Sequence, residues 1–163
     1  MPRFGTLPPD VPVDRRLEML APAFAVRVRK VLATLDGGRA EWPFETLRTE
    51  ARQTFLYGFG RDYDDGRGIV TRATSALYSW HGFGLALDIV EKDATPWVAP
   101  STFWNAIGDA AEKFGLVWAG RWHATDLPHV QWGACPVSPT EEDRMLFRTQ
   151  GMKAVWTKYG AAA

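Results

Sequence analysis

Two short segments hold the residues whose types and spacing could support metal chemistry. His81 lies in a glycine-rich turn, and Asp88 follows in a stretch that alternates like a β-strand. Gly82 and Gly84 allow the backbone to fold tightly, so the two side chains can converge on one point. A histidine nitrogen and a carboxylate oxygen are both normal zinc ligands. Because the acidic side chain would have small and apolar neighbours in the strand, it needs a partner, and a metal would serve.

The second segment runs from Asp126 to His129. His129 begins an apolar strand and can supply a third ligand, while Asp126 lies in a loop tightened by Pro128. A catalytic zinc needs three protein ligands and an open position for water, whose pKa it lowers toward neutrality. A nearby carboxylate can accept the proton of that water and pass it to the leaving amine. Spacing alone leaves alternatives open, because histidines at strand ends are often structural and His123 competes as a ligand.

Composition limits the class of protein. The 163 residues fit one ordinary domain, and the 46% of hydrophobic residues is enough for a packed core. The formal net charge of zero argues against a nucleic-acid-binding protein, which usually has a basic excess. Cys135 is the single cysteine, so the chain can form no internal disulfide. We expect Cys135 to be a small buried hydrophobic residue rather than a nucleophile.

The elements that must position these residues follow from periodicity and from helix-start and turn signals. Residues 1–13 are rich in proline and predict an irregular arm. Apolar spacing predicts a helix over 14–36, capped by Asp14, broken near Pro22 and ended by Gly37 and Gly38. Strands are predicted at 42–47, 85–90, 116–118 and 129–132. Further helices are predicted at 50–57, capped by Thr49, at 100–114, and from Thr140 onward with an interruption at Gly151. A long loop is predicted at 58–79.

The motifs resemble a known family. The first segment matches the pattern S-x-H-x-x-G-x-A-x-D at every fixed position, with Ser79, His81, Gly84, Ala86 and Asp88. The second segment resembles the D/E-x-x-H ending of the same family, with Asp126 and His129. Together they resemble the M15 zinc peptidases, which share the hedgehog/D-Ala-D-Ala peptidase fold. Residues 47–61 and 114–118 are similar to the L-alanyl-D-glutamate endopeptidases within it. The resemblance covers roughly residues 15–135 and implies an α+β fold, with a small antiparallel sheet flanked by helices, as one domain over residues 1–163.

The resemblance also implies roles for particular residues. It makes His81, Asp88 and His129 the ligands of a Zn²⁺ ion. Asp126 would be the general base, where many relatives carry glutamate, and Arg48 would stabilise the oxyanion, although a structural salt bridge remains its alternative. Weaker expectations concern substrate binding, with Gln53 lining the groove, Ser79 supporting the site by hydrogen bonding, and His123 in a loop or facing the substrate.

One departure from the family concerns the loop before Asp126. Relatives tend to have Gly-Gly-Asp after Trp118, whereas this chain has Ala119, Gly120 and Arg121. The departure puts in question any role of this loop in specificity.

The implied function is hydrolysis of the peptidoglycan stem peptide, at the L-Ala–D-Glu bond, by a phage or prophage endolysin. The N-terminus has no apolar signal segment, so we expect synthesis in the cytoplasm and holin-dependent release to the cell wall. We expect a monomer that binds neither nucleic acid nor membrane. The alternatives are a D-Ala-D-Ala carboxypeptidase or dipeptidase, a non-catalytic zinc-stabilised wall-binding module, and a metal-free domain. The loop at 58–79 is either a lid or a solvated surface loop.

Overall fold

The computed structural model describes residues 4–35, 41–92 and 97–163. None of the helices in these ranges has the length and apolar character needed to cross a membrane. The elements, in chain order, are η1 (Leu17–Met19), α1 (Pro22–Leu35), β1 (Glu41–Glu45), α2 (Glu50–Gly58), η2 (Ala76–Tyr78), η3 (Trp80–Phe83), β2 (Ala86–Glu91), α3 (Ser101–Lys113), β3 (Leu116–Trp118), η4 (Ala119–Arg121), β4 (His129–Trp132), α4 (Glu141–Gln150) and α5 (Met152–Lys158).

The four strands form one antiparallel sheet in the order β1-β2-β4-β3. This arrangement confirms the predicted α+β class with a small antiparallel sheet. β2 is central, and its Asp88 lies opposite Glu45 of β1 on one side and His129 of β4 on the other. Because side chains directly opposite one another in a sheet share a face, these three polar side chains point the same way. Pro43 lies in β1, an edge strand, where a missing backbone donor is tolerated.

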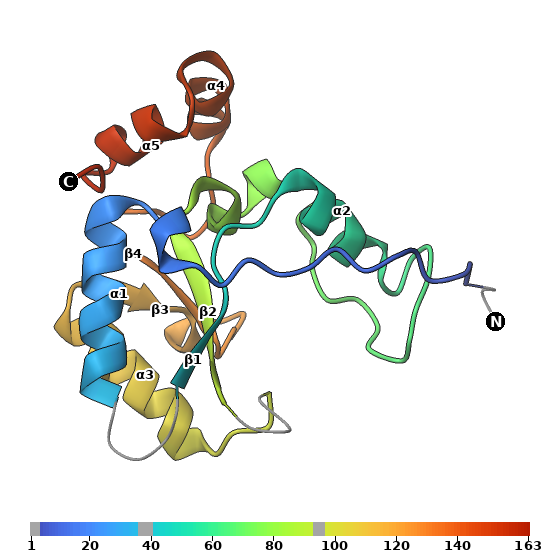
Figure 1. Ribbon diagram of the computed structural model, residues 1–163, viewed down its shortest axis with the longest axis horizontal. Coiled ribbons are helices and arrows are strands. Elements are labelled where there is room, and N and C mark those ends of the chain that lie inside the picture. The colour runs from blue at the N-terminus through green and yellow to red at the C-terminus, as the bar shows by residue number, and fades with distance from the viewer. Residues whose placement is uncertain (1–3, 36–40, 93–96) are drawn as a thin grey trace.

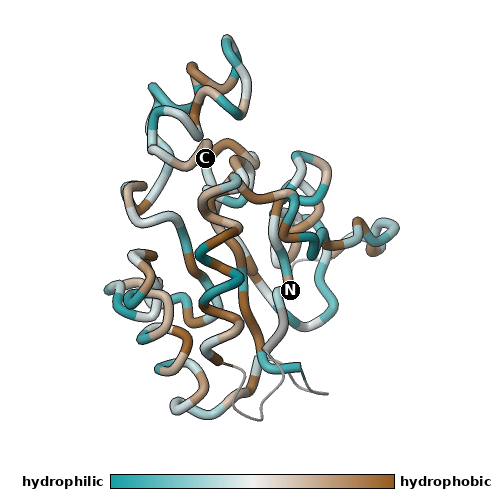
Figure 2. Tube along the Cα trace, turned by 60° about the vertical axis from the view of Figure 1, so that its left-hand side comes forward, coloured by the Kyte–Doolittle hydropathy of each residue, from teal (hydrophilic) through white to brown (hydrophobic). Residues whose placement is uncertain are grey.

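Helices α1 and α3 pack on the face of the sheet opposite these polar side chains (Figure 1). Phe24 of α1 meets Trp132 of β4 edge-on, with ring centroids 6.3 Å apart. Gly108 lets α3 approach the sheet closely, because a Cβ there would overlap the ring of Trp118. Figure 2 shows apolar stretches running through the middle of the molecule and hydrophilic ones prevailing in the loops at its edges. The core therefore lies between the two helices and the sheet.

The first predicted helix differs from the structure at its start. The helix proper begins at Pro22, where proline suits the first helical position, and residues 17–19 form a separate short turn, so the predicted break is confirmed. Asp14 caps neither element. Its carboxylate accepts hydrogen bonds from Arg16, and its carbonyl accepts one from the backbone N–H of Thr46 at 2.7 Å. The predicted helix end at Gly37 and Gly38 falls outside the described residues.

The strand predicted at 42–47 ends at Glu45, because Thr46 turns its N–H toward Asp14. The described part of the N-terminal arm contains no helix or strand, as predicted. It is nevertheless attached to the body, since Gly5 donates to the carbonyl of Asp62 at 2.7 Å. The long loop predicted at 58–79 includes the last residue of α2, Gly58, and the short helix η2 near its end.

The C-terminal helices α4 and α5 form a pair that projects at one end of the molecule (Figure 1). Thr140 and Asp143 form a capping box at the start of α4, and Gly151, at a φ of 87°, separates the helices as predicted. The fully buried Asp143 carboxylate also accepts hydrogen bonds from Lys158 at 2.7 Å and Tyr159 at 2.9 Å. This buried carboxylate therefore joins the two helices.

Candidate metal centre and active site

Three side chains converge on the polar face of the sheet. His81, Asp88 and His129 each offer a ligand atom, and these atoms all lie within 4.8 Å of one another. His81 Nε2 lies 3.3 Å from Asp88 Oδ1, and His129 Nδ1 lies 3.8 Å from the same oxygen. The three side chains are 3%, 13% and 10% exposed, respectively. The structure thus brings together the three residues predicted as ligands.

The turn η3 positions His81 with two glycines and a serine. Ser79 caps the turn, with its hydroxyl accepting a hydrogen bond from the His81 N–H at 3.3 Å. Gly84 ends the turn at a φ of 66°, a left-handed conformation that favours glycine. A Cβ at Gly82 would overlap the carbonyl of Ala76. Ser79 therefore supports the site through the backbone, in line with its predicted hydrogen-bonding role.

Hydrogen bonds to the outer ring nitrogens orient both imidazoles. His81 Nδ1 lies 3.0 Å from the carbonyl oxygen of Thr46, so Nδ1 carries the proton and Nε2 turns its lone pair toward Asp88. His129 Nε2 lies 2.9 Å from Gln131 Oε1. The Gln131 amide can face only this way, because its nitrogen donates to the carbonyl of Pro136 at 2.9 Å. His129 consequently turns the lone pair of Nδ1 toward Asp88.

The charges at the site suit a metal. Burial raises the pKa of Asp88, but interactions with His81, His129 and Arg48 outweigh it and hold that pKa below its ordinary value. Burial, together with the charge of His81, lowers the pKa of His129 to about 4. The protein therefore presents an ionised carboxylate and a neutral imidazole at neutral pH, the forms in which these groups bind zinc. Two imidazoles with fixed outer nitrogens and one carboxylate fit a catalytic zinc site.

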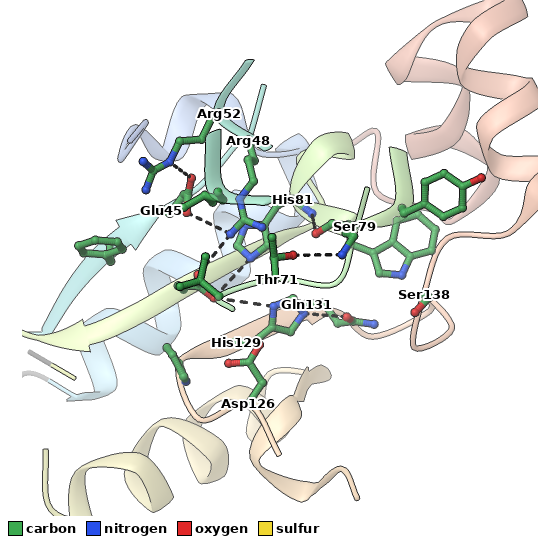
Figure 3. Close-up of a pocket in the computed structure, with 18 of the residues that line it drawn as sticks. Glu45, Arg48, Arg52, Thr71, Ser79, His81, Asp126, His129, Gln131 and Ser138 are labelled. Carbon is green, nitrogen blue, oxygen red and sulfur yellow. Dashed lines mark hydrogen bonds and ion pairs between the residues drawn. The ribbon is translucent and has the colours of Figure 1, made fainter. Parts of the chain in front are cut away.

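Asp126 lies beside His129 at the edge of this site (Figure 3). Its N–H donates to the carbonyl of Ala119 at 3.1 Å, and its own carbonyl accepts from the His129 N–H at 3.3 Å. Burial of its carboxylate and the negative charge of Asp88 raise the pKa of Asp126 to about 6, against opposing effects of His81 and Arg48. The loop that departs from the family at Ala119 thus still holds Asp126, through backbone groups that any residue provides.

Arg48 approaches the site from the other side, held by two buried partners. Its Nη2 lies 3.0 Å from Glu45 Oε2 and 3.8 Å from Asp88 Oδ2, and its Nη1 donates to Gln53 Oε1 at 3.2 Å. Figure 3 shows the guanidinium between Glu45 and the metal ligands. The two interpretations of Arg48 are therefore compatible, since its salt bridge with Glu45 orients a side chain that also lines the cavity.

Two supporting residues, Glu45 and Gln131, were not predicted from the sequence. Glu45 is 2% exposed and bridges Arg48 to Arg52, whose Nε lies 3.0 Å from Glu45 Oε1. No local signal marked Glu45, because its partners come from other elements. Gln131 follows His129 by two residues, so in a strand the two side chains lie on the same face. This spacing could have identified Gln131 as a partner of His129.

Gln53 does not line the cavity as expected, whereas His123 lies in a loop, the first of the two places expected for it. Gln53 is fully buried and does not line the cavity. Besides accepting from Arg48, it donates to the carbonyl of Ala73 at 2.6 Å, so it joins α2 to the long loop. His123 is exposed and is not among the residues that line the cavity.

The site opens into a cavity of about 860 Å³. Its walls combine charged groups around the ligands with partly exposed apolar side chains, which include Val70, Tyr78, Trp97 and Val137. Trp122 packs against the ligand His129, with ring centroids 5.6 Å apart. A volume of this size can hold a peptide of several residues next to the three ligands.

Comparisons with known proteins identify the scaffold. A family model for M15 peptidases, described as D-alanyl-D-alanine carboxypeptidase, matches residues 72–132. The crystal structure of the L-Ala D-Glu endopeptidase ChiX of Serratia marcescens is similar, with a TM-score of 0.51 and 24% identity, over 71% of this chain and 82% of that one. A search of curated proteins found no match.

Two vancomycin-resistance enzymes are also similar in structure. The D,D-dipeptidase VanXYg, in complex with a D-Ala-D-Ala phosphinate analogue, has a TM-score of 0.49 and 15% identity, over 89% of this chain and 66% of that one. The D,D-pentapeptidase VanY of the VanB-type resistance cassette, in complex with Zn(II), has a TM-score of 0.48 and 14% identity, over 81% and 80%.

The His–Asp–His donor set lies in a fold that is similar to that of the ChiX endopeptidase. The family model spans all four residues of the two motifs, His81, Asp88, Asp126 and His129. Together with the shared fold, it confirms the resemblance to the M15 family of zinc peptidases that the sequence motifs predicted.

Proposed function

We propose that this protein is a zinc metallopeptidase that hydrolyses the peptidoglycan stem peptide at the L-Ala–D-Glu bond. One observation carries the proposal. Two imidazoles and a carboxylate converge within 4.8 Å at the wall of an open cavity, with the further carboxylate of Asp126 beside them. A purely structural zinc site would be closed by a fourth protein ligand, whereas a peptidase needs a position open to water and substrate.

Each group of the site has a chemical task in this proposal. Zinc bound by His81, Asp88 and His129 would acidify water and polarise the substrate carbonyl. A carboxylate oxygen of Asp126 accepts the proton of the attacking water and then delivers it to the departing amine. A pKa of about 6 suits both transfers, because it lies near neutral pH. Arg48, fixed by Glu45 and Gln53, directs positive charge toward the oxyanion.

The choice of bond has two sources of support. Residues 47–61 and 114–118 resemble the L-alanyl-D-glutamate endopeptidases, and ChiX, which shares the fold, is named for that bond. The matching family model is instead described as D-alanyl-D-alanine carboxypeptidase, which favours release of terminal D-Ala as the second candidate. We place the L-Ala–D-Glu bond first, and with it the role of a phage or prophage endolysin acting on the wall after holin-dependent release.

The experiment is digestion of purified peptidoglycan with zinc-loaded protein, followed by mass spectrometry of the fragments. New N-terminal D-Glu supports the endopeptidase, whereas release of free D-Ala without it supports the second candidate. Asp126→Ala should keep its zinc and lose wall hydrolysis, while His123→Ala, at an exposed site outside the cavity, should keep both. Hydrolysis unchanged in Asp126→Ala would remove Asp126 from the mechanism, and no hydrolysis by the zinc-loaded wild type would favour a binding module.

A further inference from the structure

A row of charged side chains leads away from the metal ligands along one wall of the cavity. Arg48 lies nearest to Asp88, and Glu45 follows, with Arg52 on its far side at 3.0 Å (Figure 3). Arg67, from the long loop between α2 and η2, lines the same cavity. We call Arg52 and Arg67 the arginine pair.

The two guanidinium groups of the arginine pair are held in place by neighbours. Arg52 donates from Nε to Glu45 at 3.0 Å and from Nη1 to the carbonyl of Val11 at 2.8 Å. Arg67 stacks over the ring of Phe59 at 4.1 Å and donates from Nε and Nη2 to Asp65, at 2.8 Å and 2.6 Å. Little conformational entropy therefore remains to be lost when either group binds a ligand.

Each member of the arginine pair keeps one nitrogen available. Within residues 4–35, 41–92 and 97–163, no hydrogen bond reaches Nη2 of Arg52 or Nη1 of Arg67. Arg52 Nη2 is not among the buried side-chain atoms without a partner, and the side chain of Arg67 is 48% exposed, so both groups can be reached by a ligand. A guanidinium nitrogen is a donor only, and its strongest partner is a carboxylate oxygen.

One carboxylate of the protein already acts on both arginines. Asp10, an exposed residue of the N-terminal arm, has Oδ1 3.9 Å from Arg52 Nη1. Its charge also acts on Arg67, whose pKa is raised mainly by the hydrogen bond with Asp65 and also by Asp10 and Asp64. At 3.9 Å and in solvent, Asp10 is a weak partner that a substrate carboxylate could displace.

We infer that the arginine pair binds a free carboxylate of the peptide substrate, at a position displaced from the cleaved bond by the width of Arg48 and Glu45. This inference rests on the proposed function, because it takes the stem peptide as substrate. The stem peptide carries carboxylates that do not take part in its peptide bonds. The arginine pair would make the enzyme prefer a stem peptide with a free carboxylate over one in which that group is a carboxamide, because an amide offers N–H groups that meet a guanidinium poorly.

The test measures binding and not turnover, so it stands apart from the proposed hydrolysis. Zinc-loaded Asp126→Ala protein is titrated calorimetrically with a synthetic stem tetrapeptide and with versions in which one carboxylate at a time is a carboxamide. One of these replacements should weaken binding about tenfold, the loss typical of a charge-assisted hydrogen bond. Adding Arg67→Gln should weaken binding of the free acid by a similar factor and make that replacement neutral, as expected for two groups in direct contact.

Arg72→Gln is the matched control, because Arg72 is exposed on the same loop and does not line the cavity. It removes the same charge and should preserve the preference for the free acid. The inference is overturned if no carboxamide changes binding, if Arg67→Gln keeps the preference, if Arg72→Gln abolishes it equally, or if no peptide binds. Wild-type protein that binds with the predicted preference and cleaves nothing would instead support the arginine pair and defeat the proposed hydrolysis.

Discussion

Replacing Gln131 with methionine tests whether hydrogen bonds behind the ligands tune the zinc site. Gln131 is 1% exposed, and its Oε1 is the acceptor for His129 Nε2 at 2.9 Å. In Gln131→Met the side chain keeps a similar volume, but the ring N–H of His129 loses its partner in a buried place. The carbonyl of Pro136 remains satisfied, because Trp80 Nε1 also donates to it at 2.8 Å. The substitution therefore removes two hydrogen bonds, but it leaves only one buried group, the ring N–H of His129, without a partner.

The expected size of this effect follows from that single unpaired donor. A buried donor left unpaired costs about 1–3 kcal/mol, and loss of such an outer hydrogen bond weakens metal binding by about 10- to 100-fold. Competition with a chromophoric chelator at neutral pH measures the zinc dissociation constant directly. Gln131→Glu is the control, because a carboxylate still accepts from His129, although its second oxygen has no proton to donate to the carbonyl of Pro136, and it should hold zinc more tightly than Gln131→Met. Equal zinc affinity in wild type and Gln131→Met would refute the reasoning.

Further predictions concern the oxyanion arginine, the C-terminal helices, the η3 turn and the metal. Glu45→Gln removes the charge that orients Arg48, so kcat should fall about tenfold or more, with KM and bound zinc unchanged. Steady-state kinetics together with metal analysis measures these three quantities. A changed zinc content would contradict the prediction. Burial raises the pKa of Asp143, but hydrogen bonds from Lys158, Thr140 and Tyr159 outweigh this effect and hold the pKa below its ordinary value. Its stabilising contribution is thus complete above about pH 4 and lost as pH falls through the folded-state pKa, so the difference in Tm between wild type and Asp143→Asn should narrow in acid; a constant difference would speak against this assignment. Gly82→Ala forces a Cβ against the carbonyl of Ala76 and should lower the free energy of unfolding by about 1–3 kcal/mol in urea titrations, and an unchanged midpoint would show that the turn can relax. A chelator should abolish hydrolysis and lower Tm, and added zinc should restore both. The Tm should change because a ligand that binds only the folded state stabilises it by about 2.7 kcal/mol at a hundred times its Kd. Activity that survives complete zinc removal would exclude a metallopeptidase.

Local features of the fold were predictable because they depend on neighbouring residues. The break at Pro22, the cap at Thr49 and the helix start at Thr140 all appear where the residue types predicted them. The turn with Gly84 is equally local, since it needs a left-handed residue between His81 and the strand. Asp14 was the exception, because its carbonyl is used by Thr46, a partner far along the chain that no local rule reveals.

The predicted ligands His81, Asp88 and His129 were named from the resemblance of two sequence motifs, since spacing alone left His123 and structural histidines as alternatives. What only the tertiary structure decided is how these ligands are supported. The register of the sheet sets Glu45 and His129 on either side of Asp88, and a slip by one residue would turn each of them to the opposite face.

Packing between distant elements also explains why one weaker expectation failed. Gln53 is buried between α2 and the long loop, and its residue type could not show that it would not line the cavity. The position of Asp126 depends on a hydrogen bond to the backbone carbonyl of Ala119. Because any residue provides this carbonyl, the family difference in the side chain at position 119 does not remove the bond. The sequence by itself therefore determined which side chains could bind a zinc ion. The packing of distant elements determined which groups orient those side chains and which groups line the cavity that a substrate would enter.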